Sequence, residues 1–173
     1  MKYLMKSGVL YEEPQNIARA KIHNAMLGPV KEILQSGEPV LKTDIRCPKT
    51  GTSGDVRRKE YLLLDEQDHV VAEAHPDYAP GNDPTVSGWP ICRMPMVDHA
   101  QVTIEGSPYL LTMHNSQNYT MSDTNGSEIL RIMHQGLSGG WAVDDTHGFP
   151  PAEICGLFTF CRYIERENEF LTV

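Results

Sequence analysis

The 173-residue sequence contains no run of apolar residues long enough to span a lipid bilayer. A membrane-spanning helix needs about 20 such residues, so we expect no transmembrane segment. The first residues, MKYLMKSGVLYEE, also lack the apolar stretch that a secretory signal peptide requires. We therefore expect a cytoplasmic protein whose four cysteines remain reduced.

Basic residues are in the minority: 15 Lys and Arg oppose 23 Asp and Glu, which gives a formal net charge of −8. An acidic chain is repelled by phosphate backbones, so we expect no nucleic-acid partner. The exception is a short basic run, Arg57, Arg58 and Lys59, which follows the flexible segment TGTSG (50–54). Mobile backbone beside guanidinium groups can hold a phosphate, so these three residues are the predicted ligand-binding site for an anion. A solvated loop without a ligand is the alternative.

Motifs of known catalytic and metal chemistry are also missing. The sequence has no GxxxxGK[ST], no HExxH or HxH and no CxxC. The cluster Asp144, Asp145 and His147 in WAVDDTHGF is explained more simply by a turn before a helix than by acid–base catalysis. We therefore expect a protein that is not an enzyme and has no cofactor and no metal.

Most of the chain shows the pattern of short strands joined by tight polar turns, which is typical of an all-β barrel or sandwich. Its length favours a single domain over residues 1–173. The predicted strands are 30–35, 39–45, 60–65, 69–75, 101–106, 108–114, 118–123, 128–134 and 140–145.

Two segments do not fit this pattern. Residues 76–98 are rich in proline, which removes strand hydrogen-bond donors, so they are predicted to form a long loop with a short edge strand at 91–94. A loop of this length either has a function or covers the rim of the barrel. Residues 16–27 are compatible with a helix that ends at Gly28-Pro29.

Two stretches resemble each other, YLLLDEQDHVVAEAH from Tyr61 and YTMSDTNGSEILRIMH from Tyr119. Each contains Tyr, three residues, Asp, a turn, an aliphatic pair and His, which aligns His75 with His134. An internal duplication of a hairpin would produce this similarity, and chance resemblance between hairpins is the alternative.

A metal site is one hypothesis for the histidines that flank the long loop. His75 and Asp77 precede it, and Asp98 and His99 follow it, so that imidazole and carboxylate groups could converge on one ion. The matching position of His75 and His134 in the two similar stretches favours a structural role instead.

The C-terminal segment is predicted to be a helix that starts at Pro150-Pro151, with Glu153 in its first turn. From Ile154 to Ile164 its apolar residues cover nearly the whole circumference, so the helix must be surrounded by protein. A closed or nearly closed antiparallel β-barrel around this central helix meets the requirement. Cys155 and Cys161 are then small core residues.

In three features the chain resembles the superfamily of tubby C-terminal domains, plant LURP-one-related proteins and phospholipid scramblases. These are the repeated Tyr-x-x-x-Asp hairpin, the late Gly139-Gly140-Trp141 strand and the apolar C-terminal helix ICGLFTFCRYI. The resemblance covers about residues 28–173 and implies a twelve-stranded barrel around the helix. For function it implies phosphoinositide binding through a basic surface pocket.

These observations lead to two functional hypotheses. The first is a non-enzymatic binding or scaffold module whose ligand is unknown, with a phospholipid headgroup or another anion as the candidate. The alternative is a barrel that binds a small molecule, or an enzyme, with a pocket under the 76–98 loop. A helix that fills the barrel lumen would argue against an internal ligand.

Overall fold

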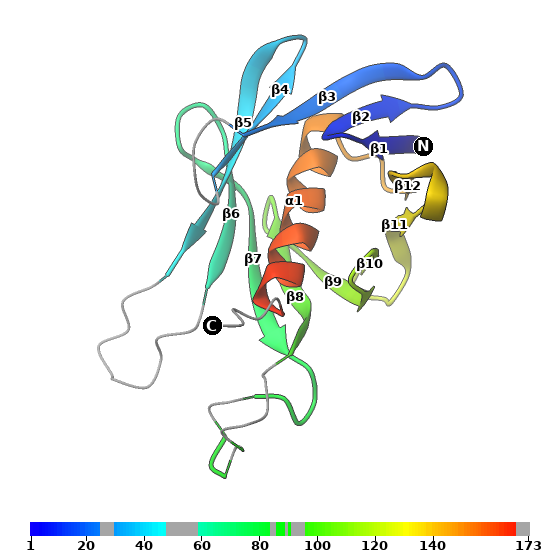
Figure 1. Ribbon diagram of the computed structural model, residues 1–173. Helices are drawn as coiled ribbons and strands as arrows, with labels where there is room; N and C mark the ends of the chain where they lie inside the picture. Colours follow the sequence, from blue (N-terminus) through cyan, green and yellow to red (C-terminus); the bar gives the residue numbers. More distant parts are fainter. Residues whose placement is uncertain (25–29, 48–58, 84–85, 89, 91–95, 169–173) are drawn as a thin grey trace.

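The computed structural model describes residues 1–24, 30–47, 59–83, 86–88, 90 and 96–168 (Figure 1). They form twelve strands, a short 3₁₀ turn and one α-helix, in the following order. The elements are β1 (Lys2–Lys6), β2 (Val9–Glu12), β3 (Ile17–His23), β4 (Lys31–Gln35), β5 (Glu38–Arg46), β6 (Glu60–Leu64), β7 (Val70–Tyr78), β8 (Val97–Ile104), β9 (Ser107–Asn115), β10 (Asn118–Ser122), β11 (Glu128–His134), η1 (Gly136–Ser138), β12 (Trp141–Asp145) and α1 (Pro151–Glu167).

The strands form one closed antiparallel barrel in which each strand pairs with its neighbours in the sequence. The barrel closes where β1 pairs with β12, with Leu4 opposite Ala142. The predicted closed, mainly β fold is therefore confirmed. At the closure Gly140 has a positive φ of 88° and a Cβ there would lie 2.8 Å from the Met5 carbonyl oxygen. This close approach explains why glycine precedes Trp141.

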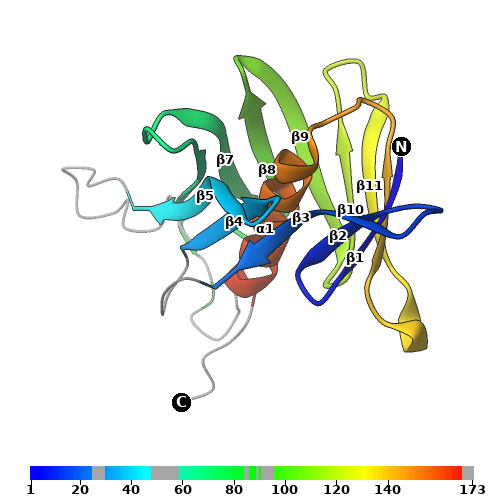
Figure 2. The ribbon, with the colours of Figure 1, turned by 90° about the horizontal axis from the view of Figure 1, so that it is seen from above.

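Helix α1 runs through the middle of the barrel, as the view along the barrel shows (Figure 2). Eleven of its 17 residues are buried, and they lie on all sides of the helix. The helix contacts β3, β4, β5, β6, β8 and β9, and Phe158 packs edge-on against Trp141 of β12 at 5.0 Å between ring centroids. A twelve-stranded barrel is wider than one that wall side chains alone can fill, so the helix supplies the missing core. The predicted central helix is confirmed.

Both ends of α1 follow from local chemistry. Pro151 occupies the first helical position, where no backbone N–H is needed, and the N–H of Ile154 donates to the Pro150 carbonyl at 3.1 Å. At the other end the Asn168 amide donates to the carbonyl oxygens of Ile164 and Val97, and its Oδ1 accepts the Val97 N–H at 2.9 Å. Asn168 thus joins the end of the helix to β8.

In the part of the chain that the structure describes, no helix has the length and the apolar content that a membrane-spanning helix requires.

The predicted hairpins are confirmed as β4–β5, β6–β7, β8–β9 and β10–β11, and the strand at 140–145 is β12. The helix considered for residues 16–27 is wrong, because residues 17–23 form β3 between β2 and β4. In β3 only Ala20 is buried, so pairing with both neighbours decides the conformation, and apolar periodicity does not. The strand proposed at 91–94 lies outside the described residues.

The two similar stretches form hairpins of the same geometry, β6–β7 and β10–β11. Each contains a register shift at the same place, after Leu63 in the first and after Met121 in the second. In each turn the aspartate carboxylate accepts the backbone N–H groups two and four residues further on, at 2.8 Å for Asp65 and 2.9 Å for Asp123. The structural offset is 58 residues, because Tyr61 pairs with Ala74 and Tyr119 pairs with Ile132.

This register corrects the alignment of the histidines. At an offset of 58 residues His75 corresponds to Met133, and His134 lies one position further on. Successive strand residues point to opposite faces, so a one-residue difference changes the face. The His75 side chain is exposed near Glu73, whereas the His134 ring lies 5.0 Å from the Trp141 ring.

Candidate functional site

The predicted basic site is only partly described by the structure. Arg57 and Arg58 lie outside the described residues. Lys59 precedes β6, and its Nζ donates to both carboxylate oxygens of Glu167 at 2.8 Å. Tyr61 donates its hydroxyl hydrogen to the same carboxylate at 3.3 Å. Lys59 therefore ties the end of α1 to the barrel wall, and the role of the three residues in anion binding stays a prediction.

A second tyrosine, on β10, holds α1 at another part of the barrel wall. The single hydroxyl hydrogen of Tyr119 is shared between the Ser116 carbonyl oxygen at 3.0 Å and the Glu165 carboxylate at 3.4 Å. Glu165 also forms an ion pair with Arg162, whose guanidinium lies 5.6 Å from the centre of the Trp141 ring. The repeated tyrosines thus have matching structural roles, which the sequence repeat alone did not reveal. Burial, and then the nearby carboxylate, raises the pKa of Tyr61.

The residues of the metal hypothesis do not form a metal site. The His99 ring binds Asp98 at 2.6 Å and lies 3.8 Å from Asp77, whereas His75 faces Glu73 at 3.8 Å. Within the described ranges no group of three or more His, Cys, Asp or Glu side chains is placed to hold a metal ion. The convergence of the two histidine–aspartate pairs on one ion is therefore wrong.

The thiols and the carboxylates before the helix serve the fold. Cys155 and Cys161 are completely buried, and burial raises the pKa of the Cys155 thiol to about 12. Their predicted role as small core residues is confirmed. Asp145 is buried at the end of β12, and its Oδ1 accepts the N–H groups of His147 and Gly148 at 3.0 Å. The turn interpretation of this cluster is confirmed too.

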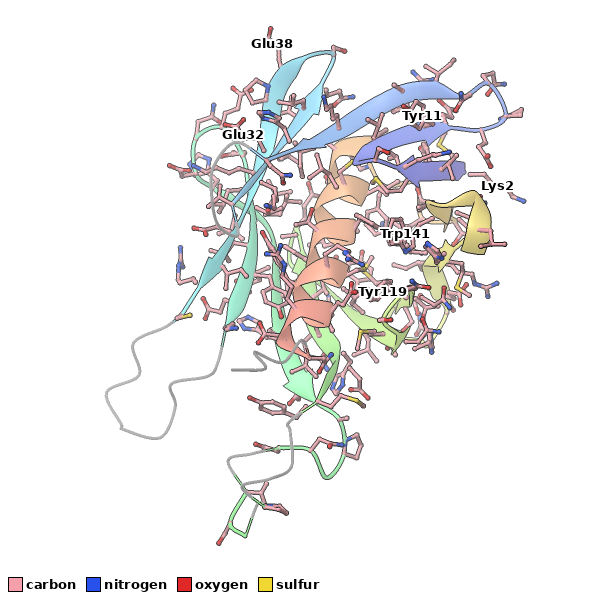
Figure 3. All side chains as sticks on the ribbon, viewed as in Figure 1. Lys2, Tyr11, Glu32, Glu38, Tyr119 and Trp141 are labelled. Atoms are coloured by element: carbon pink, nitrogen blue, oxygen red, sulfur yellow. The ribbon has the colours of Figure 1, made fainter. Side chains whose placement is uncertain are left out.

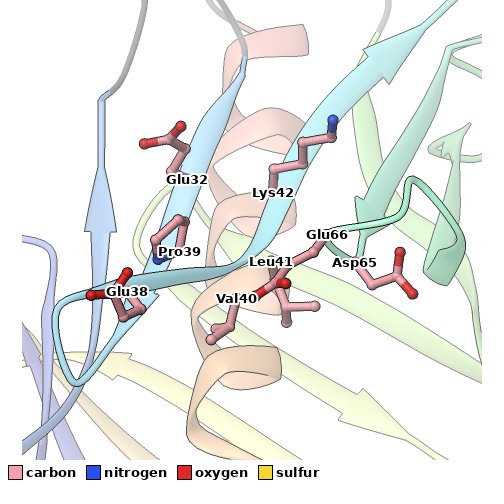
Figure 4. Close-up of a pocket in the computed structure, with 8 residues that line it drawn as sticks. All are labelled: Glu32, Glu38, Pro39, Val40, Leu41, Lys42, Asp65 and Glu66. Atoms are coloured by element: carbon pink, nitrogen blue, oxygen red, sulfur yellow. The ribbon is translucent and has the colours of Figure 1, made fainter.

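A pocket of about 550 Å³ lies on the outside of the barrel, between the β4–β5 hairpin and the β6–β7 turn (Figure 4). Figure 3 places Glu32 and Glu38 on this hairpin, on the side away from Trp141 and Tyr119. The residues that line it are Glu32, Glu38, Pro39, Val40, Leu41, Lys42, Asp65 and Glu66. Apolar side chains from β5 contribute to its wall, and four carboxylates accompany a single ammonium group.

The charges of this outer-wall pocket are arranged by the turn beside it. Asp65 accepts two backbone N–H groups of the turn, and these hydrogen bonds, first that of His69, lower its pKa. The Lys42 ammonium forms an ion pair with Asp68, which lies outside the pocket lining. The side chains of Glu38 and Glu66 are exposed and make no hydrogen bond or ion pair with any residue that the structure describes. The outer-wall pocket is therefore acidic.

Sequence reasoning missed this pocket. Glu38 and Glu66 belong to the turn regions of two predicted hairpins, and nothing in the sequence places those turns side by side. The pairing of β5 with β6, with Lys42 opposite Leu64, brings them together. The alternation of turns between the two ends of an antiparallel barrel could have indicated that both turns lie at the same end.

Comparisons of the chain with protein-family models, with curated proteins and with solved structures each found no match. Function is therefore inferred from the chemistry of the chain's own residues.

Proposed function

We propose that this chain is a non-enzymatic binding module that recognises its ligand on the outer wall of the barrel. The observation that carries the proposal is the position of α1. Its side chains occupy the lumen, and Ile154, Leu157 and Phe160 are completely buried there. Barrels that hold a small molecule do so in an open lumen, and here protein atoms take that space. The outer surface remains for recognition.

The state of the buried nucleophilic side chains supports a binding role over catalysis. Enzymes place reactive groups where substrate reaches them and shift their pKa values towards the working pH. In this chain burial raises the pKa values of Cys155, Cys161 and Tyr163 away from neutrality, to about 12 for Tyr163. These groups stay protonated and enclosed, as structural side chains do.

The fold also supports a relationship to the tubby, LURP-one-related and scramblase superfamily, which we propose as the structural class of this chain. A closed barrel of twelve strands with a C-terminal helix is what the resemblance implies. Phosphoinositide binding is the function that the resemblance would add. Against tight binding stand the net charge of −8 and the engagement of Lys59 by Glu167.

Binding to lipid vesicles, measured by co-sedimentation, tests the phosphoinositide hypothesis. We expect little or no binding to phosphatidylcholine vesicles that contain a phosphoinositide near physiological salt, because an acidic chain is repelled by anionic headgroups. Tight binding that disappears in the Arg57→Glu/Arg58→Glu variant would reverse this expectation and make the basic run the site. The pocket proposed under the 76–98 loop also stays a prediction.

A thermal-shift screen with lipids, anions, amines and metabolites tests the proposed function, with each stabilising compound mapped by amide NMR. We expect the shifted signals to belong to outer-wall residues and those of Leu157 and Phe160 to remain unchanged. A compound that shifts the lumen residues and makes Cys161 reactive to iodoacetamide would show that the helix leaves the barrel for a ligand. That result, or turnover of a compound, would overturn the proposal.

A further inference from the structure

We infer that the outer-wall pocket is a docking site for a basic segment of a partner protein, one in which lysine or arginine alternates with apolar residues. This inference rests on the proposed function and adds the site and the chemical class of the ligand. Four features of the described residues support it.

The first feature is an apolar surface that water still reaches. Val40 and Leu41 of β5 are half-buried in the lining, next to the exposed ring of Pro39. Val70 on β7 is 49% exposed, and it pairs with Leu64, which is buried beside Lys42 of the lining. Such a surface suits the aliphatic stem of a lysine or arginine and an apolar neighbour in the ligand.

The second feature is charge complementarity. The lining contains four carboxylates, and its one ammonium group is turned towards Asp68. Glu38 and Glu66 are exposed and make no ion pair within the described part of the chain. A cation is therefore attracted here, whereas a phosphate or another anion would be repelled.

The third feature is pre-organisation of the β6–β7 turn. The Oδ1 atom of Asp65 accepts hydrogen bonds from two backbone N–H groups of the turn, and its Oδ2 atom lies 3.1 Å from the Nδ1 atom of His69. These hydrogen bonds lower the pKa of Asp65, so its charge persists well below neutral pH. Because the turn is already ordered, a ligand need not supply the free energy of ordering it.

The fourth feature comes from the matching hairpin. At the offset of 58 residues Asp123 corresponds to Asp65, and Thr124 corresponds to Glu66. The β10–β11 turn has the same hydrogen bonds with a neutral residue at that position. The Glu66 carboxylate is therefore unnecessary for the turn, and its charge is available for a ligand.

A fluorescein-labelled peptide, Gly-Lys-Leu-Lys-Leu-Gly, is the probe, with fluorescence anisotropy as the readout. Binding is compared between the wild type, the pocket variant Glu38→Gln/Glu66→Gln and the control variant Glu13→Gln/Glu128→Gln. The control removes two exposed carboxylates, one after β2 and one on β11, so both variants have the same net charge. We expect the pocket variant to bind the peptide about fivefold or more weakly, because it loses the ion pairs between Glu38, Glu66 and the peptide lysines. The control variant should bind the peptide like the wild type, because its two carboxylates do not contact the peptide.

Three results would overturn the inference: no binding of the peptide, an equal loss in both variants, or equally tight binding of spermidine, which would show that charge alone is recognised. Amide NMR adds a separate check, since the peptide should shift the signals of Val40, Leu41 and Gln67. The thermal-shift screen separates this inference from the proposed function. If a ligand maps to another part of the outer wall and the peptide fails, the docking site is wrong and the binding module stands.

Discussion

The contact between Gly156 of α1 and Leu63 of β6 provides a test of the central helix. A Cβ atom added at Gly156 would lie 2.7 Å from both terminal methyl carbons of Leu63, closer than carbon atoms pack. Leu63 is completely buried, so its side chain has little space into which it can move. The perturbation is the substitution Gly156→Ala, alone and together with Leu63→Ala.

Two effects of opposite sign decide the outcome of Gly156→Ala. Replacing glycine by alanine inside a helix stabilises by about 1 kcal/mol. Overpacking of a filled core costs about 1–3 kcal/mol. We therefore expect Gly156→Ala to lower the free energy of unfolding by about 0–2 kcal/mol in the wild type. In the Leu63→Ala background the clash is gone, so the same substitution should stabilise by about 1 kcal/mol.

Urea unfolding of the four proteins gives the coupling free energy between the two positions. We expect about 1–3 kcal/mol, since the clash exists only when Leu63 is present. Leu63→Ala alone should cost about 2–5 kcal/mol and serves as the control for burial of β6. If Gly156→Ala stabilises equally in both backgrounds, the helix does not pack against Leu63 and its central position is refuted.

Three further predictions test the burial and the charge of α1. Phe158→Asp should abolish folding, because loss of the ring costs about 3–5 kcal/mol and a buried charge adds to it, whereas Phe158→Leu should fold; a melting temperature unchanged in Phe158→Asp would contradict the burial. In peptide-resolved alkylation by iodoacetamide, exposed Cys47 should react at once, and Cys155 and Cys161 should react only on unfolding; fast reaction of either buried thiol would contradict their enclosure. Burial, and then Glu105, raises the pKa of Glu153, so ionisation opposes folding as pH rises through this pKa. Glu153→Gln should therefore gain stability relative to the wild type between pH 4 and pH 7, as measured by urea unfolding, and a constant difference would argue against a raised pKa.

Tight turns made the hairpins predictable. Asp65 and Asp123 each precede a turn that their own carboxylates hold, so the hydrogen bonds that define these hairpins are local in sequence. The segment 17–23 was not predictable in the same way. Its residues are mostly exposed in the barrel, and it is a strand because β2 and β4 satisfy its backbone groups on both sides.

The histidine alignment shows how small a register error is needed to mislead. The repeat in the sequence suggested that His75 and His134 were equivalent. The observed strand pairing shows instead that Met133 occupies the position that corresponds to His75. Two similar sequences can be aligned with an error of one residue and still look alike. In a strand the same error matters, because a shift of one residue exchanges the two faces of the sheet. The repeated tyrosines kept their register, and both reach glutamates of α1.

The pocket could not have been found from composition or motifs. Its carboxylates come from β4, β5 and the β6–β7 turn, and each is an unremarked surface residue in its own segment. The basic run was visible in the sequence because its three residues are consecutive. A site that is assembled across strands leaves no such mark.

The amino-acid sequence alone determined that the C-terminal helix is enclosed and that the rest of the chain forms hairpins. Both follow from short-range physics, namely apolar residues around a whole helix circumference and turns held by neighbouring side chains. Tertiary structure alone decided the closure of β1 on β12, the strand at 17–23, the partner of Lys59 and the place of the acidic pocket. These depend on which distant segments pair, and pairing is chosen by the packing of the whole barrel around its helix.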